Sequence, residues 1–188
     1  MLSPFITALV FLINTVFGIY ILLLMLRFLF QWMRLPFRSH PILPVLFRLT
    51  NLPLQFLYNF IPSWQNIDIA AIVLMLLLKM LELALVHIWL YGQSMSPIGL
   101  VLLSIANLLS LIIYIFIFAI AIQAILTWVA RDNYNPLSDL LFHLNEPLLR
   151  PVRRLIPPLQ GIDFSPLVAI IALQLADILV IGMLRQFI

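Results

Sequence analysis

The chain has 188 residues, of which 64% are hydrophobic and 9% are charged, with ten basic and seven acidic side chains. Soluble domains carry about 25% charged residues, so this composition and the mean hydropathy of +1.17 exclude a water-soluble protein. The absence of cysteine excludes disulfides, thiolate metal sites, iron–sulfur clusters and a cysteine nucleophile.

Four apolar stretches are long enough to cross a bilayer, whose core of about 30 Å needs about 20 helical residues. They cover about residues 4–30, 67–90, 97–129 and 164–184. The first lacks a basic start and is too long for a signal-peptide core, so we expect a retained span. Continuous apolar runs without alternation favour helices over barrel strands. The sequence therefore predicts an all-α integral membrane protein with four transmembrane helices.

The loop arginines indicate how the chain is oriented in the membrane. Two long loops, residues 31–66 and 130–163, contain every loop arginine, and the opposite side shows only Arg185, near the C-terminus. Because Lys and Arg in loops mark the cytoplasmic side, we expect the long loops to be cytoplasmic and both termini to lie outside. The third connection, residues 91–96, is predicted to be a tight uncharged turn.

Each long loop contains a proline-rich segment, at residues 36–62 and 136–158. In the second segment, Asn135 is a predicted N-cap and Pro136 a first helical residue. A short amphipathic helix is expected to follow, with leucines at helical spacing opposite polar residues: Leu137, Leu140, Leu141 and Leu144 against Ser138, Asp139 and His143. The prolines from Pro147 onward are predicted to prevent one continuous helix. A re-entrant segment and a segment on the membrane surface fit this composition equally.

The two halves of the chain resemble each other at an offset of 94–96 residues. The matching positions are Trp32 and Trp128, Pro41 and Pro136, Pro53 and Pro147, and Ile67-Asp68 and Ile162-Asp163. We therefore predict two tandem repeats, residues 1–96 and 97–188, each with two spans and hence with the same orientation. Residues 55–59 of the first copy lack the arginines of the second, so we expect anion binding mainly in the second copy.

The strongest motif runs from Trp128 to Pro166 and contains Asn135-Pro136, Glu146-Pro147-Leu-Leu-Arg-Pro-Val-Arg-Arg-Leu-Ile-Pro157 and Gly161-Ile-Asp-Phe-Ser-Pro166. This pattern resembles the YggT family, also called YlmG, in its two-repeat form. The resemblance implies a small multi-pass protein of the bacterial inner membrane without enzyme activity. It also implies a role in osmotic-stress tolerance or in the organisation of cell division. In one plastid branch, the family is associated with heme attachment to a cytochrome.

The first candidate site is the arginine-proline segment, residues 145–166. Its members are three arginines and their neighbours: Arg150, Arg153, Arg154, Pro147, Pro151 and Asp163. The arginines are spaced to share one helical face, and each would contribute about 1 kcal/mol to binding an anionic lipid surface or an acidic partner. Asp163 is also expected to cap the last span. The alternative is that the arginines only fix the topology and extend to the interface.

The second candidate site is a set of charges inside the spans: Lys79, Glu82 and Asp177. Such charges cost at least about 2.5 kcal/mol each, so they indicate an ion or proton path or a polar contact between the repeats. The simpler alternative is that Lys79 pairs with Glu82 at i,i+3, or with Asp177 between spans. Arg27 and Gln123 also correspond between the repeats, and we expect them to act as anchors.

No cofactor or metal site is expected, because the histidines His40, His87 and His143 are scattered without ligand spacing. No phosphate loop or nucleophile motif indicates an enzyme. We therefore predict a non-enzymatic membrane organiser or assembly factor. Its expected partners are the lipid bilayer, anionic lipid headgroups, and a membrane protein or a second copy, with no direct nucleic-acid contact. The alternatives are a small channel or transporter component using the charges in the spans, and an accessory subunit whose loops support packing.

Overall fold

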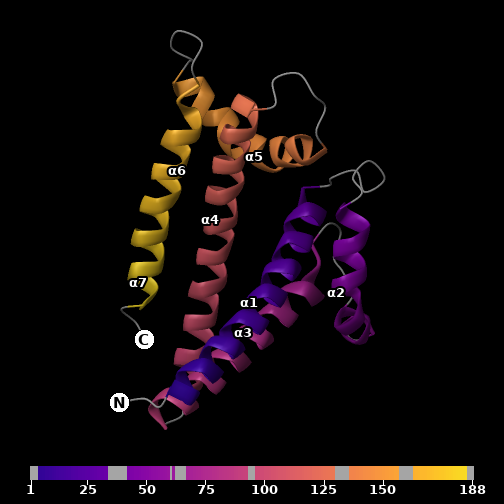
Figure 1. Cartoon of the computed structure of the whole chain (residues 1–188), viewed down its shortest axis with the longest axis vertical. Helices are drawn as coiled ribbons and strands as arrows, with labels where there is room; N and C mark the ends of the chain where they lie inside the picture. Colours follow the sequence, from indigo (N-terminus) through magenta and orange to yellow (C-terminus); the bar gives the residue numbers. More distant parts are fainter. Residues whose placement is uncertain are drawn as a thin grey trace. The chain divides into compact units, whose positions relative to one another are not determined.

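A computed structural model describes residues 4–33, 42–59, 61, 67–92, 96–129, 136–156 and 163–185. Most of these residues are helical, and no β-strand element occurs among them (Figure 1). The chain forms two compact units, one of Met1–Leu108 with Leu184–Ile188 and one of Leu109–Met183. Their boundary falls inside a helix, and the division into repeats at residue 96 stays a prediction.

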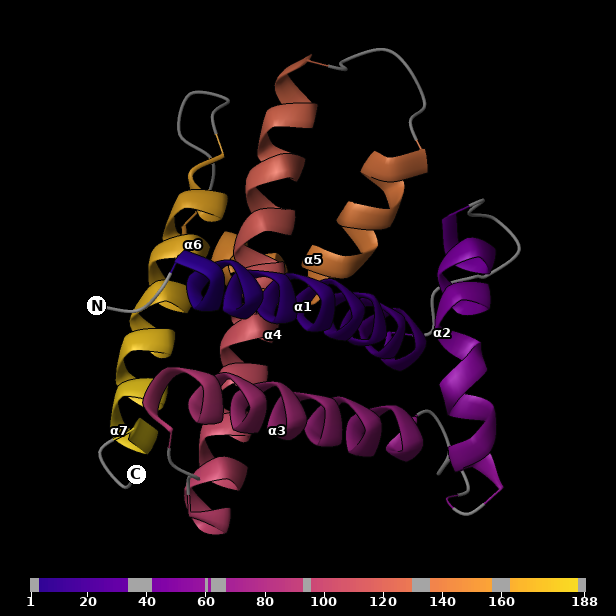
Figure 2. The same cartoon turned by 60° about the horizontal axis from the view of Figure 1, so that its bottom comes forward.

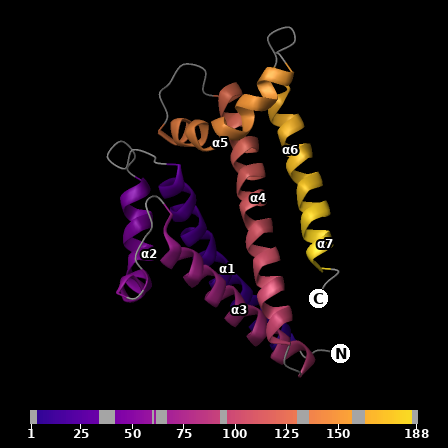
Figure 3. The ribbon, with the colours of Figure 1, turned by 180° about the vertical axis from the view of Figure 1, so that it is seen from behind.

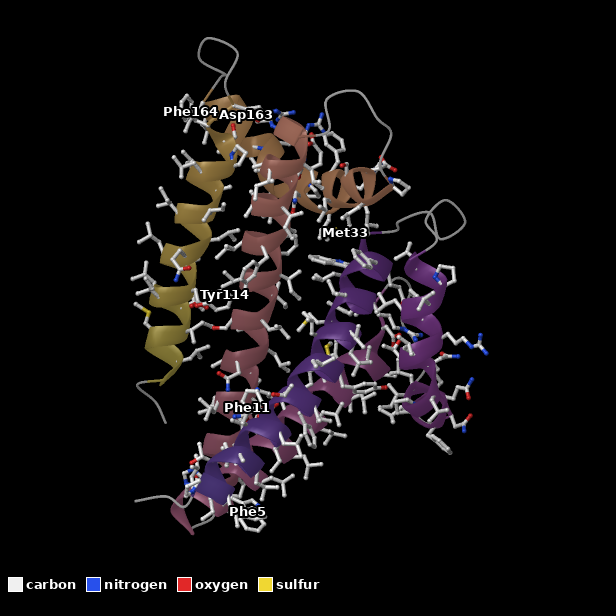
Figure 4. The ribbon with its side chains drawn as sticks, in the orientation of Figure 1. Phe5, Phe11, Met33, Tyr114, Asp163 and Phe164 are labelled. Atoms are coloured by element: carbon white, nitrogen blue, oxygen red, sulfur yellow. The ribbon has the colours of Figure 1, made fainter. Side chains whose placement is uncertain are left out.

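Four helices are long and apolar enough to cross a membrane, as the sequence predicts. They are α1 (Pro4–Trp32), α3 (Ile69–Tyr91), α4 (Pro97–Val129) and a composite helix over Ser165–Leu184. Their ends lie within about two residues of the expected ones, the uncertainty of any helix boundary. Large apolar side chains such as Phe5 and Phe11 point away from α1 (Figure 4), as expected for a surface that lipid covers.

Polar residues define where the spans begin and end. The Asp68 carboxylate accepts the backbone N–H of Ala71 at 3.1 Å and caps the start of α3. Gly92 ends α3 with φ at +66°, in the left-handed region where a Cβ would be strained. Four residues later, the Ser96 hydroxyl accepts the N–H of Gly99 at 3.1 Å and starts α4. The residues between, 93–95, lie outside the described part of the chain.

The last span is composite. It consists of α6 (Ser165–Ala176), the π-helical turn η1 (Asp177–Ile181) and α7 (Gly182–Arg185). A π-turn holds one residue more than an α-turn and often occurs at functional sites. Here it begins at Asp177, one of the charges predicted inside the membrane.

In the first unit, α1 and α3 lie side by side and run in opposite directions. The helix α2 (Ile42–Tyr58) crosses the end of α1 and the beginning of α3 (Figure 2). One face of α2 is buried against the two spans, through Leu43, Leu46, Thr50 and Leu54. Small side chains, Ala70 and Ala71, are buried at the start of α3, where they permit close approach of the helices.

The second unit has the same kind of arrangement. The helices α4 and α6 run in opposite directions, and α5 (Pro136–Leu155) crosses the end of α4 and approaches the start of α6 (Figure 3). The three helices meet in a buried apolar cluster of Ile120, Leu149 and Ala169. Each unit is therefore two spans with a crosswise helix at one end.

The prediction that prolines would break the crosswise helix is wrong for α5. The helix is continuous from Pro136 to Leu155, although Pro147 and Pro151 lie inside it. Each internal proline removes one backbone hydrogen bond, and burial of Leu140, Leu141 and Leu144 offsets this cost. The predicted N-cap Asn135 and the predicted stop at residues 157–158 lie outside the described residues. Leu137, expected to face inward, is 39% exposed.

Candidate functional site

The buried arginine of α1 fastens α2 to the first unit. Arg27 is only 4% exposed, and its guanidinium donates to the Thr50 hydroxyl at 2.9 Å and to the Tyr58 hydroxyl at 3.0 Å. The Phe47 ring lies with its centroid 4.3 Å from the guanidinium carbon, at cation–π distance. These contacts compensate for removing a charge from water, a cost that would otherwise be several kcal/mol. Arg27 therefore anchors α2 rather than a lipid interface.

Tyr58 connects this arginine to the start of α3. Its hydroxyl accepts from Arg27 and donates to the Asp68 carboxylate, which is 1% exposed. Burial, followed by the hydrogen bond to Asp68, raises the pKa of Tyr58 from 10.0 to about 12, so the phenol remains a donor at neutral pH. The three side chains join α1, α2 and α3 in one polar chain.

In the second unit, two separate contacts hold α5. The amide of Asn145, fully buried, donates to the Gln123 side-chain oxygen of α4 at 2.8 Å. At the other end of α5, Arg153 donates to Glu146 at 2.9 Å and to Asp163 at 3.0 Å. Asp163 also accepts the N–H of Ser165 at 2.9 Å, so it caps α6 as the sequence suggested (Figure 4).

Asp163 is held in its charged form by these donors. Partial burial alone would raise the pKa of its carboxyl group. The hydrogen bonds from Ser165 and Arg153, with the positive charge of Arg153, outweigh burial and lower the pKa below the ordinary value of 3.8. Asp163 is therefore ionised at neutral pH and ties the end of α5 to the start of α6.

The two units use corresponding positions for these contacts. The pairs 95 or 96 residues apart are Arg27 and Gln123, Thr50 and Asn145, Tyr58 and Arg153, and Asp68 and Asp163. The cation lies on the span in the first unit and on the crosswise helix in the second. Residues 55–59 of the first copy lack the arginines of the second, and the cation in its contacts comes from the span instead, as Arg27. The sequence analysis did not identify Thr50 and Asn145 as contact residues, although they are separated by the same offset as the other matching positions.

The structure separates the three predicted arginines. Arg153 is half-buried and occupied by Glu146 and Asp163, whereas Arg150 and Arg154 are exposed. Within the described residues, neither of these two makes an ion pair or a side-chain hydrogen bond. They lie four residues apart, one helical turn, so their guanidinium groups share one face of α5. Pro147 and Pro151 are exposed on the same helix. Whether this face binds lipid or protein stays a prediction.

The charges inside the spans form two separate contacts, one in each unit. Lys79 pairs with Glu82 at 2.8 Å on α3, as the i,i+3 alternative predicted. The hydroxyl of Ser110 donates to Asp177 at 2.6 Å. Glu82 is 4% exposed, and its second carboxylate oxygen has no hydrogen-bond partner among the described residues. The same residues contain no group of three or more His, Asp or Glu side chains suited to a metal ion.

Comparison with known proteins agrees with this architecture. The family model described as CCB3/YggT matches residues 6–89 and 102–184 of the chain. An uncharacterised protein of Pseudomonas aeruginosa is 37% identical over 177 residues, covering 94% of this chain and 89% of that protein. An uncharacterised protein of Vibrio alginolyticus is 32% identical over 170 residues, covering 90% and 91%. The uncharacterised protein YggT of Escherichia coli K12 is 29% identical over 177 residues, covering 90% and 87%. No solved structure matches the chain. With both halves and most of its length matched, the chain belongs to the CCB3/YggT family.

Proposed function

We infer that this chain is a non-enzymatic organiser of the bacterial inner membrane, in which α5 binds anionic lipid headgroups at the cytoplasmic face. The observation that carries this proposal is that the three arginines of α5 differ in their contacts. Arg153 fixes α5 to α6 through Asp163, and this leaves Arg150 and Arg154 exposed together without an ion pair among the described residues. A cationic face on a rigidly held helix is suited to binding a layer of negative charge.

The position of α5 supports headgroups as the ligand. The helix crosses the ends of two spans, which is the depth at which headgroups meet the hydrocarbon core. Two arginines at about 1 kcal/mol each favour an anionic surface by about 2 kcal/mol, or roughly thirtyfold in affinity. The distribution of loop arginines supports a cytoplasmic location of this face. The family resemblance points to osmotic-stress tolerance or to division and envelope organisation as the process served.

The test compares the purified chain in bilayer nanodiscs with and without phosphatidylglycerol. We expect anionic lipid to raise the thermal unfolding midpoint, since a ligand that binds the folded state stabilises it. The variant Arg150→Gln/Arg154→Gln should lose most of this shift, and the matched control Arg48→Gln, an exposed arginine of α2, should retain it. An equal shift in the double variant would refute lipid binding at α5. A double variant that keeps the lipid shift but loses a protein captured by cross-linking would indicate an acidic protein partner.

A small channel or transporter component remains the second candidate. It is favoured by the Glu82 carboxylate, whose second oxygen is buried without a partner, and by the π-turn that begins at Asp177. The test is ion and osmolyte flux into proteoliposomes, comparing wild type with Lys79→Met, Glu82→Gln and Asp177→Asn. Flux that these changes abolish would replace the organiser proposal. Absence of flux in the wild type would leave the face of α5 as the leading site.

A further inference from the structure

The crosswise helix of the first unit has three distinct stripes. Its buried stripe contacts the spans through residues such as Leu43, Leu46 and Leu54. A second stripe consists of large apolar side chains that are 57–74% exposed: Val45, Leu49, Leu52 and Phe56. Their spacing of four, three and four residues places them on one face of the helix. This face points away from the buried one, because at 3.6 residues per turn the centres of the two sets are about 140° apart around the helix.

The polar residues of α2 form the third stripe. Thr50 and Tyr58 are used in the contacts to Arg27, which leaves three polar side chains, Arg48, Asn51 and Gln55. These three recur at spacings of three and four residues, so they share one face. In one direction around the helix, this polar face separates the buried stripe from the exposed apolar stripe. In the other direction, only apolar residues lie between the two stripes.

We propose that α2 is an interfacial helix whose stripe of Val45, Leu49, Leu52 and Phe56 inserts among the acyl chains of the bilayer. A helix at the edge of a membrane has protein on one side, water above, and hydrocarbon beside and below it. The stripes of α2 occur in this order around the helix. Lipid fits the exposed stripe better than a protein surface does, because α2 packs across the ends of α1 and α3, two helices long and apolar enough to cross a membrane.

The two crosswise helices then contact different layers of the membrane. The exposed residues of α5 include Arg150 and Arg154, which suit headgroups, beside apolar ones such as Leu155, whereas the exposed stripe of α2 consists of branched and aromatic side chains, which suit hydrocarbon. Arg27 holds α2 at this depth through Thr50 and Tyr58. This inference concerns a different helix from the proposed headgroup site and does not depend on it.

The absence of cysteine from the chain allows a direct test. Single variants Leu49→Cys and Gln55→Cys, about a third of a turn apart around α2, each carry one environment-sensitive fluorophore, in vesicles of phosphatidylcholine and phosphatidylglycerol. Both side chains are exposed, so neither label disturbs the buried stripe. Two quenchers report the surroundings: lipids brominated on the acyl chain and iodide in the aqueous phase. Unchanged circular dichroism and thermal midpoint would show that both labelled proteins are folded.

The expected result is a reversal between the two positions. Brominated lipid should quench the label at position 49 severalfold more than the one at 55, and iodide should do the opposite. Equal, strong iodide quenching at both positions would place the apolar stripe in water and overturn the proposal. A label at position 49 that neither quencher reaches would also overturn it, because a protein surface, such as a second copy, would then cover the stripe.

Discussion

The cation of the polar contacts lies on the span in the first unit and on the crosswise helix in the second. Whether these two arrangements are equivalent can be tested by moving the cation of the first unit from the span to the crosswise helix. In the first unit, Arg27→Gln with Tyr58→Arg would place an amide on the span and a guanidinium on the crosswise helix, as Gln123 and Arg153 are placed in the second unit. The Tyr58 hydroxyl already donates to the Asp68 carboxylate, so a longer cationic side chain at position 58 is within reach of it.

Each single change should destabilise the chain. Arg27→Gln removes two hydrogen bonds from a charged donor, to Thr50 and Tyr58, and each such bond contributes about 1.5–3 kcal/mol. The shorter amide replaces at most one of them, so we expect a loss of about 1.5–3 kcal/mol. Tyr58→Arg places a second cation beside Arg27 and the single carboxylate of Asp68, and we expect it to lower the free energy of unfolding by a similar amount. The double variant restores one cation for Asp68, so its loss should be smaller than the sum by about 1–3 kcal/mol.

The measurement is the apparent free energy of unfolding in mixed micelles for the wild type, both single variants and the double variant. The matched control Arg48→Gln, an exposed arginine on the same helix, should change it by less than about 0.5 kcal/mol. If the two single losses simply add in the double variant, the contacts at positions 27 and 58 are independent. The corresponding positions of the two units would then not be coupled in their contribution to stability.

Three further predictions concern the same contacts. Because the pKa of Asp163 is lowered, its bonds stabilise the fold above its ordinary value of 3.8. This stability is lost as the pH falls through the folded-state pKa, so the protection of α5 amides relative to their intrinsic exchange rates should fall in acid, and Asp163→Asn should reduce that pH dependence. Burial and the bond to Asp68 raise the pKa of Tyr58 to about 12, so its contribution is complete below pH 10.0 and is lost as the pH rises toward 12. Tyr58→Phe should therefore reduce the fall of the unfolding midpoint in that window. Lys79→Met leaves the Glu82 carboxylate unpaired and should lower the free energy of unfolding by about 3–5 kcal/mol. The double variant Lys79→Met/Glu82→Gln should recover most of this loss. If the single and double variants are equally unstable, the ion pair does not stabilise the fold.

The spans could be predicted from the sequence because length and apolar composition determine them almost alone. Each runs to within about two residues of its expected ends, and even the cap at Asp163 followed from its place before an apolar run. The pair of Lys79 and Glu82 was equally accessible, since residues three apart on a helix are neighbours.

The contacts of the crosswise helices could not be predicted in the same way. Which polar residue bonds to which depends on how α2 and α5 lie across the spans, and local spacing says nothing about that. Arg27 and Gln123 correspond in the sequence, but only the packing brings Thr50 and Asn145 to them. The continuity of α5 through Pro147 was missed for a related reason, because propensity describes an isolated helix and burial overrides it.

The different positions of the buried cation also affect how each unit is made. Arg27 precedes its acceptor Tyr58 by 31 residues, so at about 5–20 residues per second it waits roughly 2–6 s for that partner to leave the ribosome. Arg153 precedes Asp163 by ten residues and waits roughly 0.5–2 s. The nascent first span therefore enters the membrane with an uncompensated charge near its end, whereas the second unit's ion pair forms almost as soon as it is synthesised.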